Sequence, residues 1–148
     1  LYSAPAGATT ALVIDLTGVY TTGSGATFTP LGPTRILDTR VGSGGTSGAL
    51  RAGVPQTVHL AGTDGVPGDA TAVTLNATIV GQTAAGYLSI TPEPTSAPET
   101  SILNFPLGDI RANGITLPLS SLGSVSIVYM AAPGARANVV LDLSGFFR

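Results

Sequence analysis

The stretch Val139-Val140-Leu141-Asp142-Leu143-Ser144-Gly145-Phe146-Phe147 decides how this sequence is organised. Nearly the same pattern stands close to the start, as Leu12-Val13-Ile14-Asp15-Leu16-Thr17-Gly18-Val19-Tyr20. The early copy alternates between apolar and polar residues and is rich in β-branched types. Both features are typical of a half-buried β-strand.

The similarity extends beyond the two strands. When residues 1–20 are placed on residues 128–147, an offset of 127 without a gap, eight of the 20 positions are identical. Self-similarity at a fixed spacing is the mark of repeat architectures. We therefore expect residues 1–21 to be the closing strands of a preceding repeat, and residues 22–148 to be one complete β-repeat domain of a tandem array.

The composition excludes several classes of protein. Only 9% of the residues are charged, against roughly 25% in an ordinary soluble domain. The net charge of −2 argues against a nucleic-acid partner, which requires clustered positive charge. No uninterrupted apolar run reaches the roughly 18–20 residues of a membrane span. Few charges, no Lys, no Cys and much Thr, Ser and Gly together indicate an extracellular or cell-surface protein.

The chain reads as a series of short strands separated by Gly- and Pro-rich turns. No window carries a sustained helical stripe of apolar residues. We predict an all-β fold, an antiparallel β-sandwich or barrel of about nine to ten short strands. The expected strands are residues 11–20, 26–30, 56–61, 70–80, 86–91, 100–105, 114–119, 124–130 and 139–147. Residues 41–50 are expected to form a mobile loop.

Several motifs in fixed order resemble a known repeat. They are Pro33-Thr34-Arg35-Ile36-Leu37-Asp38-Thr39-Arg40, Gly65-Val66-Pro67, Thr100–Phe105, Ala112-Asn113 and the closing strand. Together they resemble the "P-x-R-L-L-D-T-R" repeat of secreted actinobacterial and related bacterial surface proteins, with Ile36 where Leu is usual. The resemblance implies a non-catalytic module that occurs in tandem, often beside hydrolase or peptidase domains. It implies no particular ligand or catalytic residues.

The main polar candidate is the cluster of Arg35, Asp38 and Arg40, with Asp142 of the closing strand. In an extended segment, side chains two apart share a face, so Asp38 and Arg40 can present together to a ligand. The structural alternative is that Asp38 accepts hydrogen bonds in a turn while an Arg pairs with Asp142 or Asp15. We favour the structural alternative, since a buried carboxylate requires a partner.

Other candidate sites are weaker. Asp64 and Asp69 flank a turn and are the sort of pair that contributes to a Ca²⁺ site, but ordinary turns explain them better. His59, the only histidine, would have to serve any Ser-His-Asp device, and no Gly-x-Ser-x-Gly motif accompanies it. We therefore expect no catalytic residues, no metal and no cofactor.

The leading hypothesis is a structural module of a stalk, adhesin or filament that associates with neighbouring copies of itself. An inter-module contact is predicted at Leu12, Ile14, Asp15, Leu16 and Tyr20, because an unpaired strand of low charge is a template for association. The alternative is a cell-wall or polysaccharide-binding module attached to a secreted enzyme. In that case the Arg35–Arg40 loop and Asn76, Asn104 or Asn113 would contact glycan.

Overall fold

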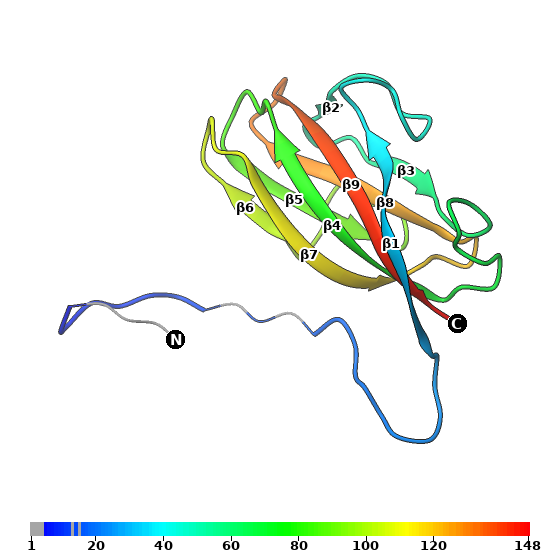
Figure 1. Ribbon diagram of the computed structural model, residues 1–148. Helices are drawn as coiled ribbons and strands as arrows, with labels where there is room; N and C mark the ends of the chain where they lie inside the picture. Colours follow the sequence, from blue (N-terminus) through cyan, green and yellow to red (C-terminus); the bar gives the residue numbers. More distant parts are fainter. Residues whose placement is uncertain (1–4, 13, 15) are drawn as a thin grey trace.

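The computed structural model describes residues 5–12, 14 and 16–148, and its strands form two antiparallel sheets (Figure 1). The strands are β1 (Phe28–Asp38), β2 (Leu50–Arg51), β3 (Gln56–His59), β4 (Ala72–Val80), β5 (Gly86–Thr91), β6 (Leu103–Phe105), β7 (Arg111–Pro118), β8 (Ser124–Ala131) and β9 (Arg136–Phe147). None of the described residues forms a helix of the length and hydropathy that a membrane span requires.

The larger sheet is built around β9. Its order is β1-β9-β4-β7, with the short β2 also paired to β9. Along β9, Asp142 faces Arg35 of β1 on one side and Asn76 of β4 on the other. The last strand of the chain is therefore the central strand, hydrogen-bonded to neighbours on both edges.

The second sheet has the order β3-β8-β5-β6, and the core lies between the two sheets. Residues alternate along β4, so that Val73, Leu75, Ala77 and Ile79 point into the core while the residues between them are only partly buried. From the second sheet, Leu88, Ile127 and Tyr129 are among the fully buried side chains that meet them. The predicted all-β antiparallel sandwich is confirmed, and the alternative of a closed barrel is wrong because the strands divide into two sheets.

Two predicted boundaries near the start of the larger sheet are wrong. The strand expected at residues 26–30 continues through the charged segment to Asp38 as β1, across Pro30, Gly32 and Pro33. The register of β1 on β9 shifts between Pro30 and Thr34 and again between Arg35 and Leu37. These irregularities let an edge strand carry prolines, which have no N–H to donate. The expected loop 41–50 ends in β2, because Leu50 pairs with Ala137.

The strand predicted at residues 11–20 is not formed in the described part of that segment, residues 11, 12, 14 and 16–20. Figure 1 shows the N-terminal segment running outside the two sheets. A strand needs a neighbour for its backbone hydrogen bonds. The place in the sheet that suits this sequence pattern, between β1 and β4, is filled by β9. The side chains of Leu12, Ile14 and Leu16 are therefore exposed.

One local structure in the N-terminal segment repeats a turn of the sandwich. Residues 5–8 form a turn closed by a hydrogen bond of 3.1 Å from the Ala8 amide to the Pro5 carbonyl. At the same offset of 127, the Ala135 amide donates to the Ala132 carbonyl at 3.1 Å in the turn between β8 and β9. The central glycines take the same left-handed conformation, with φ of +85° at Gly7 and +82° at Gly134.

The core position of Leu75 provides a test of the sandwich. Leu75→Ala should lower the free energy of unfolding by about 2–5 kcal/mol, since the neighbouring strands close only part of the cavity. Leu122→Ala is the matched control, because Leu122 is 78% exposed and its truncation should cost less than about 0.5 kcal/mol. Urea denaturation followed by circular dichroism measures both. Equal losses in the two variants would contradict this packing.

Candidate functional site

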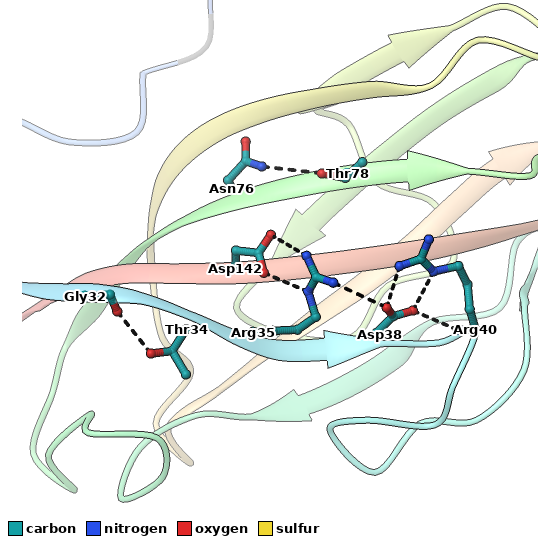
Figure 2. Close-up of polar contacts among 8 residues, drawn as sticks. All are labelled: Gly32, Thr34, Arg35, Asp38, Arg40, Asn76, Thr78 and Asp142. Carbon is teal, nitrogen blue, oxygen red and sulfur yellow. Dashed lines mark hydrogen bonds and ion pairs between the residues drawn. The ribbon is translucent and has the colours of Figure 1, made fainter.

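The four charged residues singled out in the sequence lie together on the outer face of the larger sheet (Figure 2). Arg35 and Asp38 belong to β1, Asp142 lies opposite Arg35 on β9, and Arg40 follows directly after β1. The cluster contains two ion pairs, Arg35 with Asp142 and Arg40 with Asp38. A longer contact of 3.7 Å, between Nη1 of Arg35 and Oδ2 of Asp38, links one pair to the other.

The first pair joins β1 to β9. Arg35 donates from Nε to Oδ1 of Asp142 at 2.9 Å and from Nη2 to Oδ2 at 3.2 Å. This two-bond geometry matches the guanidinium fork to the carboxylate, and it raises the pKa of Arg35 above its ordinary value. Solvent screens the pair because about half of the Arg35 side chain is exposed. The pair therefore fixes the relative position of two strands more than it adds stability.

The second pair closes the turn after β1. Arg40 donates to Asp38 from Nε at 2.8 Å, from Nη2 at 2.6 Å and from its backbone N–H at 3.1 Å. Asp38 is only 3% exposed. The hydrogen bonds from Arg40 outweigh the effect of burial and hold the pKa of Asp38 at about 2. Asp38 thus acts as an acceptor that organises the turn.

Thr39 belongs to the same site, although no motif or charge in the sequence predicted a role for it. Its buried hydroxyl donates to Oδ1 of Asn138 at 3.0 Å and accepts from the Val139 amide at 3.0 Å. The Thr39 amide in turn donates to the Val139 carbonyl at 3.1 Å. These bonds fasten the end of β1 to the first half of β9. A hydroxyl group is neutral, so the charge pattern of the sequence does not identify Thr39. Its position between Asp38 and Arg40 is the only indication in the sequence.

The three asparagines considered for glycan contact do not gather on one surface. Asn76 lies on the outer face of β4 and its amide donates to the Thr78 hydroxyl at 3.4 Å (Figure 2). Asn104 on β6 and Asn113 on β7 lie where the two sheets meet at their edge, and their amides donate to Ser101 and to the Ile102 carbonyl. Each of these amide groups already has a partner within the protein.

The remaining polar candidates are separate from the cluster. His59 lies opposite Ser124, with Nδ1 at 3.2 Å from the serine hydroxyl, in the pairing of β3 with β8. Asp64 adopts a positive φ of 49° in its turn, and Asp69 lies within 4.0 Å of Arg148. Among the residues that the structure describes, no group of three or more His, Asp or Glu side chains is placed to hold a metal ion.

The residues predicted for inter-module contact lie elsewhere, along the N-terminal segment. Asp15 falls outside the described residues. Leu16 and Tyr20 form one wall of an open groove of about 580 Å³, whose other walls are β7 and the segments around β5 and β6. In the described part of the chain, β7 pairs only with β4, so its other edge faces this groove.

Comparison with protein-family models and with curated proteins found no match.

The lowered pKa of Asp38 predicts how stability depends on acid. The unfolded chain takes up a proton at this carboxyl below about pH 4, its ordinary range, whereas the folded chain resists protonation down to about pH 2. The stabilisation from Asp38 is therefore complete above about pH 4 and is lost as the pH falls toward 2.

Asp38→Asn should lower the urea midpoint at neutral pH and flatten the acid dependence between pH 4 and 2. Arg40→Gln should have a similar effect on the acid profile, because it removes the first cause of the lowered pKa. Urea titrations at stepped pH measure both. A wild-type acid profile in Asp38→Asn would show that Asp38 does not organise the turn.

The hydroxyl of Thr39 gives a second test. Thr39→Val keeps the shape of the side chain but leaves the buried Val139 amide without an acceptor, and should cost about 1–3 kcal/mol of stability. Thr34→Val is the control, because the exposed Thr34 hydroxyl bonds only to the nearby Gly32 carbonyl and its loss should cost under about 0.5 kcal/mol. Equal denaturation midpoints for the two variants would contradict this role for Thr39.

Proposed function

We propose that this chain is a non-catalytic structural module of an extracellular repeat protein, and that neighbouring modules associate through the segment from Leu12 to Tyr20. One observation carries the proposal. A segment whose sequence is similar to that of the central strand lies outside the sheets, and its described apolar side chains at residues 12, 14, 16, 19 and 20 are exposed. The corresponding residues of β9, Val139, Leu141 and Leu143, are completely buried.

The exposed apolar side chains lie close together in the sequence, and in a module that stayed monomeric they would remain in contact with water. Leu12, Ile14, Leu16, Val19 and Tyr20 are each more than three-quarters exposed. Contiguous apolar surface of this kind is typical of regions that another molecule covers. The neighbouring copies of the repeat are the partners proposed.

The free edge of β7 is the best acceptor for such a strand. It is eight residues long, while β3 and β6 at the edges of the second sheet have four and three. The opposite edge strand, β1, contains Pro30 and Pro33, which weaken an edge for pairing. A strand added to β7 would satisfy its unpaired backbone groups, a common way of joining β-modules.

The charged cluster supports a structural role in preference to a catalytic or sugar-binding one. Both carboxylates are bound by guanidinium groups of the same chain, and the Asp38 carboxylate also accepts a backbone amide. A carboxylate held in this way is neither a free base nor a free ligand acceptor. Extracellular location is proposed from the low charge and the absence of Lys and Cys, together with the resemblance to secreted surface repeats.

Deletion of residues 1–21 should leave residues 22–148 folded and abolish end-to-end association. The double substitution Leu12→Asp, Leu16→Asp tests the same contact without removing residues. Both side chains are exposed, so the domain should stay folded while association is lost. Sedimentation velocity measures association, and thermal denaturation measures folding. If the truncated chain unfolds, the segment belongs to the core of the module and the proposed joint is wrong.

Titration of soluble cell-wall glycan fragments separates this proposal from the sugar-binding alternative. A structural module should release no heat of binding in calorimetry. Saturable binding that disappears in an Arg35→Ala, Arg40→Ala variant would favour the glycan-binding module instead.

A further inference from the structure

We propose that the position of β9, between β1 and β4, is a strand-acceptor site with two possible occupants, β9 itself and the N-terminal copy of β9 at residues 9–20. The copy binds as a β-strand of the same register. This inference concerns the affinity of the segment for the β9 position and holds whether or not neighbouring modules join end to end.

The end of β9 lies beside the start of β1, which gives the copy a route into the site. Phe147 pairs with Phe28 across the sheet. Beyond that pair, Thr27 and Arg148 exchange backbone hydrogen bonds of 2.7 and 3.1 Å. With Tyr20 in the place of Phe147, residues 21–27 would connect the two antiparallel strands. Neighbouring antiparallel strands need only a short turn, so seven residues suffice.

The end of the copy already lies at the entrance of the site. The ring of Tyr20 is 6.1 Å from that of Phe147, which is 5.0 Å from the ring of Phe28. The aromatic residues that close the two copies therefore lie side by side at the point where β1 begins. Exchange of the copies starts from this contact, without a large movement of residue 20.

The buried face of the copy has apolar side chains at the three central positions of the site. Val139, Leu141 and Leu143 of β9 are fully buried. At the offset of 127 they correspond to Leu12, Ile14 and Leu16. Substitutions among apolar residues of similar volume are the ones that cores tolerate best.

The outer face of the copy also matches. Asp15 corresponds to Asp142, the partner of Arg35. Gly18 corresponds to Gly145, where a Cβ atom would lie 2.8 Å from the Thr29 carbonyl oxygen. The copy thus keeps a glycine at a position where a Cβ atom would collide with β1.

The turn that leads into each copy is the same. The hydrogen bond from Ala8 to Pro5 repeats the one from Ala135 to Ala132, and Gly7 and Gly134 share their left-handed conformation. The turn forms at residues 5–8 outside any sheet, so it is set by the local sequence. The segment is therefore shaped at its start for the same strand.

Three differences explain why β9 holds the site. Thr10 stands where β9 has Ala137, which has no exposure, so the copy would place a hydroxyl group in the core. Ala11 stands where β9 has Asn138, so the copy offers no side-chain partner to the Thr39 hydroxyl. Val19 stands where β9 has the buried Phe146, so the copy fills less of the core. All three differences favour β9, and none of them prevents the copy from binding once β9 is removed.

Leu141→Arg in the full chain tests the proposal. A guanidinium group in place of a side chain with no exposure should expel β9. The chain should then stay folded with residues 9–20 in the site and unfold at a lower urea concentration than wild type. Amide hydrogen exchange followed by NMR should show protection lost from residues 136–147 and gained by residues 9–20.

Ile14→Arg is the matched control for folding, because Ile14 is 82% exposed. This variant alone should keep the wild-type urea midpoint and the wild-type protection of residues 136–147, whatever it does to association between modules. The double variant Ile14→Arg, Leu141→Arg should be unfolded, because each of the two segments then carries a charged side chain at a position that must be buried in the site. If Leu141→Arg alone shows no protection at residues 9–20, or is as unfolded as the double variant, the proposal is overturned. If the wild-type chain shows no end-to-end association in sedimentation experiments, the joint between modules is refuted and this result is unchanged.

Discussion

The larger sheet depends on the two-sided pairing of β9. β1, β2 and β4 are all hydrogen-bonded to it, and only β7 joins the sheet without touching it. β9 also supplies several fully buried side chains to the core. Its pairing with β1 joins residues more than 100 positions apart, as between Arg35 and Asp142. Contacts of such long range are typical of slowly folding β-proteins. The sheet is incomplete until the end of the chain takes its place.

The polar cluster is best understood as part of this same constraint. β1 is irregular, with register shifts on either side of the stretch from Thr34 to Arg35, and each shift interrupts the backbone ladder. The Arg35–Asp142 pair lies between the two interruptions, and the Thr39 bonds to Asn138 and Val139 follow the second. Side-chain bonds thus hold an edge strand where its backbone bonds are disturbed. This accounts for three charges within six residues of a chain with few charges.

The sequence predicts the regular strands well and the irregular ones poorly. Alternation places β4, β5 and β8 within two residues of their observed ends. β5 and β8 pair with each other without a register shift, and so does β4 with β7, although β4 shifts once on β9 between Thr74 and Leu75. The extent of β1 is missed because prolines and a glycine indicate a loop unless the partner strand is known. The two residues of β2 are too few for any periodicity. Within the polar site, charge identifies Arg35, Asp38, Arg40 and Asp142, whereas the role of Thr39 depends on burial that no pattern reveals.

The two copies of the closing segment show that alternation alone does not make a strand. Only one of two similar sequences can pair with β1 and β4 at a time, and in this structure β9 does so. Chain connectivity hardly distinguishes them: residues 132–135 link β8 to β9, and residues 21–27 would link the copy to β1. Loop closure changes by only about 0.6 kcal/mol for each doubling of length, and seven residues are less than twice four. The choice of occupant therefore rests on side chains at a few positions, above all Ala137, Asn138 and Phe146.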